Sequence, residues 1–499
     1  MSFTSFQHPD DFKRLRDVFE AARYNDAAII EVLGVKDIPS LRGEDVPLLL
    51  RRTNQGTPLD TLIRLFLIEV PCDRKEAQRA FQPMTLEKLA DAGLIHADGT
   101  RVKAAVKLLP FHGLLIAFDS TRMLQTEFKR DYVMGIGRST LTLANLTVRR
   151  QAGMTLDLGT GCGIQAFLAA RHSSRVLAVD KNPRAVHMAS FNARLNGLSH
   201  VACLEGDLFG PVQGRMFDLI VTNPPFVISP EMKYIYRDSG MEADQVCQKI
   251  ISQVPRFLNN GGYCHILCNW TEHAGQDWRE WLRGWFQGTG CDVWVMRSET
   301  RDAATYAATW IRHTEKEAPE DFDRHFEKWM AYYDQQGITA MGAGLITMHR
   351  SAKGRYWYRA DDAPEKMLGP CGDSMVRGFE LQDFLETVQD DSLLLNTRFR
   401  VSPDVCLKRL AKPSAAGWVD ETIRLHISRG LAYSGNIDSY MANVIVKCDG
   451  QRQLKDLLAE IANAPGVDLE KIRPIFCQMI RGLVERGFLL PRDLHADFM

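Results

Sequence analysis

The sequence predicts an α/β fold of the Rossmann-like type, built on a seven-stranded sheet, and three observations point to it. An apolar strand at 154–157 runs through a glycine-rich loop into a helix that begins at Ile164. Two later apolar strands, 175–180 and 201–207, each end in an aspartate. A further strand, 217–222, is followed at once by Asn-Pro-Pro. Strands that alternate with helices favour a parallel sheet, which binds ligands beyond the carboxyl ends of its strands.

The first loop reads Asp-Leu-Gly-Thr-Gly-Cys-Gly over residues 157–163. Glycine lets a ligand approach the backbone closely, but a dinucleotide fingerprint would need a further glycine where Ile164 stands. An acid at the strand end suits a ligand that carries a cationic amino group better than one that carries a pyrophosphate. S-adenosylmethionine has such a group and NAD does not. We therefore expect S-adenosylmethionine, and its product S-adenosylhomocysteine, to bind at Asp157, Gly159, Thr160, Gly161 and Gly163.

The next two strands extend this pocket. Asp180 ends the strand 175–180, where such folds bind ribose hydroxyls, and Asn182 then begins a helix. A carboxylate can accept hydrogen bonds from both hydroxyls of a ribose. Asp207 is expected at the adenine amine, with Leu208 and Phe209 as apolar walls. The alternative is that Asp207 only caps a turn.

The run Asn223-Pro224-Pro225-Phe226 leaves the carboxyl end of the strand 217–222. Two prolines stop strand pairing and fix the backbone, so the amide of Asn223 lies rigidly at the mouth of the sheet. A conjugated amine is a poor nucleophile. If the oxygens of Asn223 and Pro224 accept its two hydrogens, its lone pair gains electron density and direction. Phe226 can stack on the planar group, and these four residues are the candidate catalytic residues.

Together, residues 157–163, Asp180, Asp207 and 220–226 resemble the class I S-adenosylmethionine-dependent methyltransferases of the methyltransferase small domain group. That group includes the glutamine methyltransferases of release factors and ribosomal proteins and the guanine-N2 methyltransferases of ribosomal RNA. The Asn-Pro-Pro-aromatic element also looks like that of adenine-N6 methyltransferases. The resemblance implies the cofactor and attack by nitrogen, but not the substrate. The glutamine enzymes usually carry tyrosine where this chain has Phe226.

The remaining segments complete the predicted sheet and its surroundings. Strands are expected at 262–268, 291–296 and 338–348, with a helical insertion between 303 and 336 that is a candidate lid. The segment 236–240, just after the Asn-Pro-Pro-Phe run, is polar and either contacts the substrate or is an ordinary solvated loop.

Three domains are expected: residues 1–120, 121–360 and 375–499. Proline and glycine cluster between 364 and 374, which indicates a boundary. Both flanking regions predict a winged-helix-like α+β domain, because in each a helix runs through glycine into an apolar strand, at 86–95 and at 480–489. The second is similar to the small peptide-binding winged helices of peptide-modifying pathways.

Composition limits the other possibilities. A formal net charge of −1 weighs against a large nucleic-acid partner without excluding one. The odd count of 11 cysteines, without metal-ligand spacing, indicates reduced thiols and no metal site. No apolar run approaches the roughly 20 residues of a membrane span, and the first ten residues lack a secretion signal, so a cytoplasmic protein without a membrane partner is expected.

The sequence therefore predicts an N-methyltransferase that acts on a planar amino or amide nitrogen. The acceptor is a protein or peptide side chain or a nucleobase, and a small-molecule amine in a closed pocket is an alternative. A cofactor-binding scaffold without catalysis is a further alternative, against which the intact Asn223-Pro-Pro-Phe226 argues.

Overall fold

The computed structural model describes residues 6–38, 45–120, 130–314, 319–354, 356–415, 417–462 and 468–494. The chain divides into two compact units: Met1–Ala144 with Arg150–Asp361, and Asn145–Arg149 with Asp362–Met499. Each unit is described by itself.

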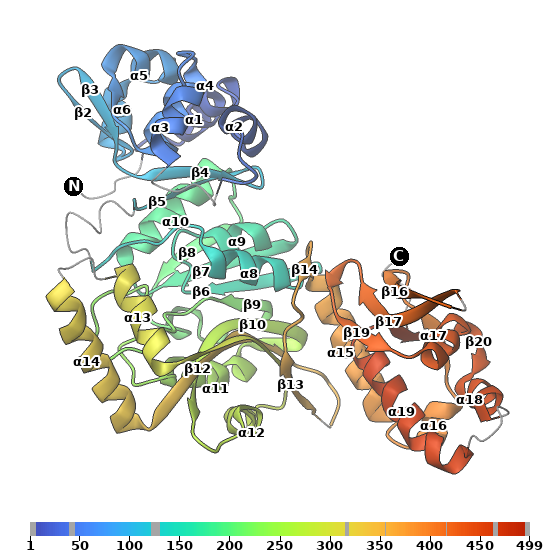
Figure 1. Cartoon of the computed structure of the whole chain (residues 1–499). Coiled ribbons are helices and arrows are strands. Elements are labelled where there is room, and N and C mark those ends of the chain that lie inside the picture. The colour runs from blue at the N-terminus through green and yellow to red at the C-terminus, as the bar shows by residue number, and fades with distance from the viewer. Residues whose placement is uncertain are drawn as a thin grey trace. The chain divides into compact units, whose positions relative to one another are not determined.

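The first unit begins with a helical part that carries two small sheets (Figure 1). Its strands β1, β2 and β3 pair in the order β1-β3-β2, and β4 pairs with β5 in a separate hairpin. Asp73 caps helix α5 by accepting a hydrogen bond from Lys75 N, and Thr57 caps α4 with a reciprocal bond to Asp60. The elements are α1 (Pro9–Ala21), α2 (Asp26–Leu33), α3 (Val46–Arg52), α4 (Pro58–Ile63), the π-helical turn Arg64–Ile68, β1 (Cys72–Asp73), α5 (Arg74–Phe81), α6 (Leu86–Asp91), β2 (Ile95–Asp98), β3 (Arg101–Ala104), β4 (Lys107–Phe111) and β5 (Leu114–Phe118).

The centre of this unit is a mixed sheet in the order β13-β11-β12-β10-β9-β6-β7-β8. Strands β10, β9, β6, β7 and β8 run parallel, and β12 is antiparallel to both of its neighbours. The strands are β6 (Ala152–Leu158), β7 (Ser173–Asp180), β8 (Val201–Glu205), β9 (Phe217–Thr222), β10 (Leu258–His273), β11 (Asp292–Asp302), β12 (Ile338–His349) and β13 (Tyr358–Asp362). The chain order reverses between β6 and β9, so a crevice opens beyond their carboxyl ends.

Helices cover both faces of this sheet (Figure 1). One hydrophobic core joins α9 and α10 to the N-terminal helices, and a second joins α11 and α12 to the opposite face. The sheet is thus buried on two sides, as continuous apolar strands require. The helices are α8 (Arg138–Leu146), α9 (Ile164–Ala169), α10 (Pro183–Leu195), α11 (Gln245–Gln253), α12 (Trp278–Arg283), α13 (Ala303–Thr314) and α14 (Pro319–Gln336), with 3₁₀ turns at Gly210–Val212, Val254–Arg256 and Gly284–Phe286.

The architecture is the α/β sheet that the sequence predicts, with one difference in strand number. Seven strands were expected and the sheet has eight, because β13 adds to the edge beside β11. Trp294 Nε1 donates to Asp361 at 3.1 Å and Val293 N donates to Trp357 O at 3.0 Å, which fixes this added strand. The predicted helical insertion is confirmed as α13 and α14.

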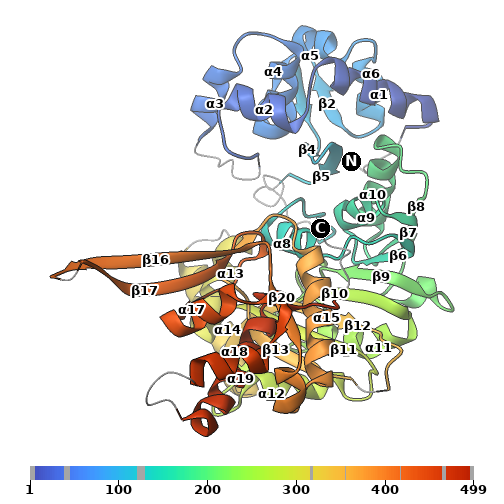
Figure 2. The same cartoon turned by 90° about the vertical axis from the view of Figure 1, so that its right-hand side faces the viewer.

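The second unit contains the long hairpin of β16 and β17 (Figure 2) and a three-stranded sheet in the order β20-β15-β21. Helix α19 begins at Leu469, where Asp468 caps it by accepting from Glu470 N, and it contains Pro474. The elements are β14 (Met367–Leu368), α15 (Gly372–Thr387), α16 (Asp391–Leu395), β15 (Arg398–Val401), β16 (Val405–Ser414), β17 (Gly417–Ile427), β18 (Gly430–Leu431), β19 (Ser434–Ile437), α17 (Ser439–Val446), β20 (Asp449–Gln453), α18 (Leu454–Ala462), α19 (Leu469–Glu485) and β21 (Leu489–Pro491).

Candidate active site

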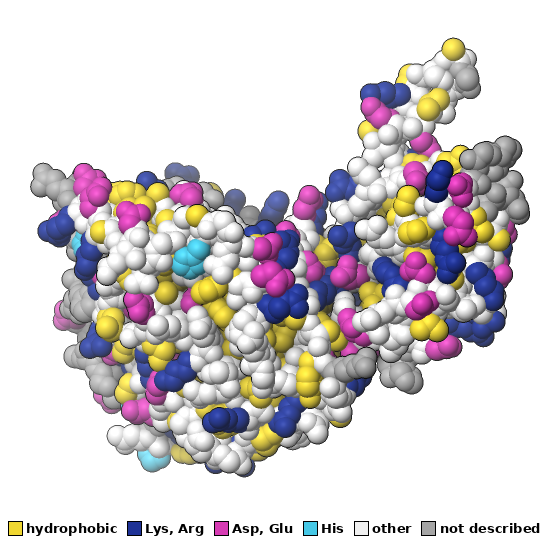
Figure 3. All heavy atoms as spheres, turned by 90° about the horizontal axis from the view of Figure 1, so that it is seen from below, with side chains coloured by type: hydrophobic (Ala, Val, Ile, Leu, Met, Phe, Trp, Pro, Cys, Tyr) yellow, Lys and Arg dark blue, Asp and Glu magenta, His cyan; other side chains and the backbone are white. Residues whose placement is uncertain are grey.

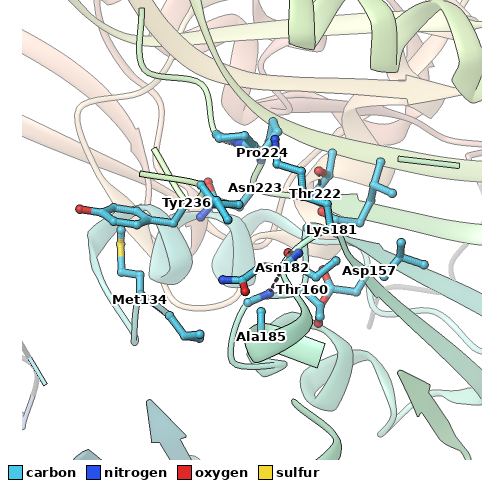
Figure 4. A pocket seen from close by; sticks show the side chains of 18 of the residues that line it. Met134, Asp157, Thr160, Lys181, Asn182, Ala185, Thr222, Asn223, Pro224 and Tyr236 are labelled. Atoms are coloured by element: carbon cyan, nitrogen blue, oxygen red, sulfur yellow. Dashed lines mark hydrogen bonds between the residues drawn. The ribbon is translucent and has the colours of Figure 1, made fainter. Parts of the chain in front are cut away.

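A pocket lies beyond the carboxyl ends of β6, β7 and β9, at the reversal of strand order (Figure 4). Adjacent strands β6 and β9 pair Leu158 with Thr222, so the glycine-rich loop and the Asn-Pro-Pro turn start side by side. The pocket brings together most of the residues that the sequence singles out: Asp157, Gly159, Thr160, Gly161, Asp180, Asn182, Asp207, Leu208, Asn223, Pro224 and Pro225. Gly163 and Phe226 are not among the residues that line it.

Asp157 is the buried acid of the pocket. Its Oδ2 accepts hydrogen bonds from Thr160 Oγ1 at 2.6 Å and from Ala166 N at 3.0 Å, so it holds the loop against the first turn of α9. Burial raises the pKa of this carboxyl from 3.8 to about 7, against the opposing effect of these two bonds. A cationic ligand beside Asp157 would therefore favour the ionised form of a group that is half protonated near neutral pH.

The glycines of the loop have backbone conformations that other residues avoid. Gly159, Gly161 and Gly163 have φ of 73°, 54° and 93°. Gly163 also lies so close to the ring of Phe167 that an added Cβ would be 2.2 Å from Phe167 Cζ. Gly163 therefore packs against the helix behind the loop, whereas Gly159 and Gly161 line the pocket.

Asp180 at the end of β7 ties two parts of the pocket together. Its Oδ2 accepts from Gly161 N at 2.8 Å and its Oδ1 accepts from Asn182 N at 2.9 Å, and burial raises its pKa. Each carboxylate oxygen has a second lone pair, so ribose hydroxyls can still be bound here. The side chain of Asn182 caps α10 through Arg184 N and donates to Asp131 O at 2.9 Å, which holds the chain before α8 against the pocket.

The residues expected at the adenine edge differ in their positions. Asp207 and Leu208 line the pocket, and Leu208 has a φ of 47°, a conformation that costs a non-glycine residue about 1–3 kcal/mol. Phe209, expected as an apolar wall, instead lies in the hydrophobic core and stacks on Phe257 at 4.4 Å.

Asn223 dominates the other half of the pocket. Its Nδ2 is 3.3 Å from the hydroxyl of Ser139 in the first turn of α8, a contact that the sequence did not indicate. Its Oδ1 is buried and has no hydrogen-bond partner among the described residues. A buried acceptor without a donor costs about 1–3 kcal/mol, so this oxygen is suited to a ligand that brings an N–H group.

Tyr236 lines the pocket, whereas Phe226 is not among its lining residues. Phe226 pairs its backbone with Asp238 and packs its ring against two hydrophobic clusters. Tyr236 lines the pocket beside Asn223 and Met134 (Figure 4), and burial raises its pKa to about 12. Phe226 is partly buried against these clusters, and its stacking on the acceptor stays a prediction.

We name residues 227–243 the acceptor loop, since Ile235, Tyr236, Ser239 and Met241 line the pocket. Two of its charged residues are buried: the exposed fractions of Arg237 and Asp238 are 1% and 6%. Arg237 donates to both carboxylate oxygens of Asp238 at 2.7 and 3.0 Å. Asp238 also accepts from the backbone N of Lys233 and Tyr234. The sequence alone does not show whether an adjacent arginine and aspartate form a buried or an exposed ion pair.

Among the described residues, no group of His, Cys, Asp and Glu is arranged to hold a metal ion. No helix in the described ranges is long and apolar enough to cross a membrane. All 11 cysteines are free thiols.

A glycine-rich loop after β6, acids at the ends of β6 and β7, and an Asn-Pro-Pro turn after β9 define the class I methyltransferase type of α/β pocket. Residues 137–288 match the family model "Methyltransferase small domain", and the chain belongs to this family of S-adenosylmethionine-dependent enzymes. Residues 21–105 and 377–491 match two models described as domains of unknown function, DUF7059 and DUF7782.

Curated relatives match the same region. The putative protein N5-glutamine methyltransferase of Methanocaldococcus jannaschii is 32% identical over 136 residues, which are 26% of this chain and 68% of that one. The release factor glutamine methyltransferase of Geobacter sulfurreducens is 32% identical over 158 residues, 29% of this chain and 53% of its own. The ribosomal RNA small subunit methyltransferase C of Alcanivorax borkumensis is 32% identical over 117 residues, 23% and 32% of the two chains. The chain thus spans between a third and two thirds of these relatives.

Among solved structures, the YcgJ protein of Bacillus subtilis is 15% identical and aligns over 43% of this chain and 98% of its own, with a TM-score of 0.30. A score this low adds no weight, and the fold assignment rests on the strand order and the family match.

Proposed function

We propose that the protein transfers the methyl group of S-adenosylmethionine to a planar amide or amino nitrogen, and that its acceptor is a side-chain amide of a protein or peptide. The observation that carries this proposal is Asn223 Oδ1, a buried acceptor without a partner, in the pocket that also contains the acids and glycines of the cofactor half. A donor of the N–H type is what that atom needs.

The residues present suit the cofactor. Asp157 would hold its amino group, Gly159 and Gly161 would allow its close approach, and Asp180 would accept from its ribose hydroxyls. Bound there, it supplies a methyl group on a cationic sulfur that is already a good leaving group. The chain's own task is then positioning, which can supply a large part of a rate enhancement.

Asn223 and Pro224 would do this positioning at the acceptor nitrogen. When Asn223 Oδ1 and the carbonyl of Pro224 accept the two amide hydrogens, the nitrogen lone pair is directed away from them and is less delocalised. Methyl transfer to a nitrogen held in this way would release one of its two N–H protons to water. Neither residue needs to act as a general base.

The charge of the chain and the names of its relatives favour a protein acceptor over a nucleobase. Lys and Arg side chains of the described residues are interspersed with Asp and Glu on the face seen in Figure 3, and the net charge of the chain is −1. Protein surfaces that bind nucleic acid are usually basic. Two of the three relatives described above are named for glutamine, and one for ribosomal RNA. A guanine or adenine amino group is the second candidate, because the same two acceptors would fit it.

We further propose that both flanking regions are winged helices. In the first unit, α5 and α6 lie between β1 and β2, and the sheet order β1-β3-β2 is the order of that fold. In the second unit, α17, β20, α18, α19 and β21 follow the same sequence of elements, with β15 between the two strands.

The test uses the full chain, cofactor labelled at the methyl group, and cell extract separated into protein, RNA and small-molecule fractions. Label in protein that is stable to base and maps to glutamine or asparagine supports the proposal. Label in RNA would replace the protein acceptor by a nucleobase. Label in small molecules would favour an amine substrate, and label in none of the fractions would refute methyl transfer.

A further inference from the structure

The acceptor loop is long and irregular, and it forms one wall of the pocket. It begins directly after Phe226 and runs to Ala243, without a helix or a strand of its own. Its backbone therefore lacks the regular hydrogen bonds that would hold a pocket wall in place, and other groups must supply them.

We infer that the inserted helices α13 and α14 are the scaffold of this loop, and that Tyr306 and Tyr333 are positioning residues for methyl transfer. The inference rests on the proposed function for the step it affects, and on the contacts below for the scaffold itself.

The hydroxyls of the two tyrosines bind the backbone N–H and C=O groups of one residue, Ile228. Tyr306 Oη accepts a hydrogen bond from Ile228 N at 3.2 Å, and Tyr333 Oη donates to Ile228 O at 2.8 Å. All three residues are at most 3% exposed. Asn269 Nδ2 donates to Tyr306 Oη at 2.8 Å, which fixes that hydroxyl to strand β10. Ile228 lies five positions after Asn223, so the catalytic turn is anchored directly behind its end.

Further contacts from α14 follow the loop to its end. Lys328 Nζ donates to Glu231 Oε1 at 2.8 Å, and Tyr332 Oη accepts from Ala243 N at 3.0 Å. Between them, the guanidinium of Arg237 lies 5.8 Å from the ring centre of the buried Trp329. The loop is thus held near its start, its middle and its end by one helix.

The contacts are those of a support and not of a lid. Val227 and Ile228 share a hydrophobic cluster with Ala307, Ile311 and Trp329 of the insertion, and this cluster excludes water. A lid must separate from the pocket to admit substrate, which would expose all of this apolar surface. The helices therefore remain in place while the loop presents Tyr236 and Met241 to the acceptor.

Small errors in position matter in this chemistry, because the acceptor nitrogen must align with the methyl carbon. A misplacement of about 1 Å can reduce a rate by roughly a hundred-fold. Removal of either hydroxyl leaves one buried group of Ile228 unpaired and loosens the wall of the pocket without removing any group that touches a ligand.

The experiment compares Tyr333→Phe and Tyr306→Phe with Tyr358→Phe in the full chain. Tyr358 on β13 is the control for loss of a tyrosine hydroxyl: its hydroxyl donates to the carbonyl of Arg279 on α12 at 2.8 Å. We expect each test variant to lower kcat/KM for the acceptor by about tenfold or more, with cofactor affinity within about threefold of wild type. Hydrogen exchange of residues 227–243, followed by mass spectrometry, should accelerate in both test variants and not in the control.

The outcomes separate the two proposals. If wild type methylates its acceptor and both test variants match it, the positioning role is overturned and the proposed function stands. If exchange in 227–243 is unchanged in both variants, the scaffold is overturned whatever the activity. If wild type methylates nothing, the proposed function fails, and the exchange measurement still decides the scaffold. Equal losses in Tyr358→Phe would show a general effect of a lost tyrosine hydroxyl and would also overturn the inference.

Discussion

Asn223 performs its proposed role with a single atom, the buried Oδ1 that has no donor among the described residues. The other atom of the amide, Nδ2, is 3.3 Å from Ser139 Oγ, so the side chain is held at both its backbone and its amide. The side chain of a neighbouring residue is equally fixed, since Thr222 Oγ1 donates to Leu158 O at 2.7 Å. The position of the acceptor nitrogen is thus determined by groups that are rigid before any ligand arrives.

The first prediction concerns Asn223 itself. Asn223→Ala removes one preorganised acceptor, and we expect single-turnover methyl transfer to slow by about a hundred-fold or more. Cofactor affinity should stay nearly the same, because the cofactor half of the pocket is built on β6 and β7. Asn223→Asp should keep part of the activity, since a carboxylate also accepts N–H hydrogen bonds. Wild-type turnover in Asn223→Ala would show that the acceptor is held elsewhere.

The second prediction uses the raised pKa of Asp157, about 7 in the free protein. The ionised carboxylate binds a cationic amino group, so cofactor affinity should fall as the pH drops below 7, by up to about tenfold per pH unit. Stability of the free protein should show the opposite sign. The folded state holds this proton more tightly than the unfolded state, so its contribution is full below pH 3.8 and is lost as pH rises towards about 7.

Calorimetry between pH 5.5 and 8.5, a range of about one and a half units on either side of this pKa, measures the effect on affinity. The control is Asp157→Asn, which retains the shape and cannot ionise. Its cofactor affinity should be weak and independent of pH in this range. A wild-type affinity that is flat across the same range would exclude Asp157 as the group that binds the cation.

The third prediction separates the two aromatic residues of the acceptor side. Tyr236→Ala should mainly raise KM for the acceptor, by the equivalent of about 1–3 kcal/mol if a planar base stacks there and by less if the acceptor is an amide. Phe226→Ala should instead lower the melting temperature, since its ring packs against two core clusters. The measurements are steady-state kinetics and thermal unfolding of both variants. If Phe226→Ala instead raises KM for the acceptor without lowering the melting temperature, the ring of Phe226 contacts the substrate.

At the scale of elements, the loop between β6 and α9 shows how backbone geometry builds the pocket. Gly159, Gly161 and Gly163 all have φ in the left-handed region, and they let three peptide groups turn within seven residues. Only Gly163 also lacks space for a side chain, because of Phe167. The three glycines therefore differ in how they would respond to substitution.

The fourth prediction follows from that difference. Gly163→Ala should destabilise the fold by about 2 kcal/mol or more, because the methyl group meets the Phe167 ring and the backbone is strained as well. Gly197→Ala is the matched control: its φ is 67°, and its added Cβ would meet only the end of Arg16 at 4.0 Å. Chemical unfolding of both variants gives the comparison. If the two lose equal stability, contact with Phe167 is not what requires glycine at 163.

The sequence predicted the elements that carry strong local signals. The strands β6, β7 and β9, the insertion helices and the Asn-Pro-Pro turn all have apolar runs or proline and glycine that act within a few residues. What it missed depends on distant partners. The β13 edge strand needs β11 to pair with, the backbone of Phe226 forms a bridge with Asp238, and Ser139 meets Asn223 across 84 residues of chain. No local pattern contains such a contact.

At the scale of the whole molecule, the two flanking regions differ in how they relate to the cofactor pocket. The sequence expectation treats residues 1–120 and 375–499 alike, as separable domains. Within the first unit, however, the N-terminal residues share one hydrophobic core with α9 and α10, the helices behind the pocket. Phe12 and Phe191 are 5.2 Å apart between ring centres, and Arg194 lies 4.2 Å over Phe12.

Polar contacts reinforce this shared core. Asn192, which is fully buried on α10, exchanges hydrogen bonds with Ala117 on β5 at 2.8 and 2.9 Å and also donates to Cys162 O in the glycine-rich loop. Removal of β5 would leave this buried amide with unpaired groups directly beside the loop, at a cost of about 1–3 kcal/mol for each group. The side chain of Asn192 thus links the glycine-rich loop to the N-terminal part.

The last prediction is that the two ends of the chain are not equivalent. A fragment of residues 1–374 should unfold cooperatively and bind the cofactor within about threefold of the full chain. It retains Cys371 and Gly372, and Cys371 N donates to Asn145 O at 2.8 Å, so the last turn of α8 keeps this contact. A fragment of residues 121–499 exposes the apolar faces of α9 and α10 and should lack both cofactor binding and a cooperative transition for the first unit. Circular dichroism melts and calorimetry of the two fragments measure this.

If the 121–499 fragment binds the cofactor as well as the 1–374 fragment does, the N-terminal part is separable as the sequence suggests, and the shared core contributes little to the pocket. If instead only the 1–374 fragment binds, substrate choice can be assigned to the second unit by testing whether that fragment still methylates the natural acceptor.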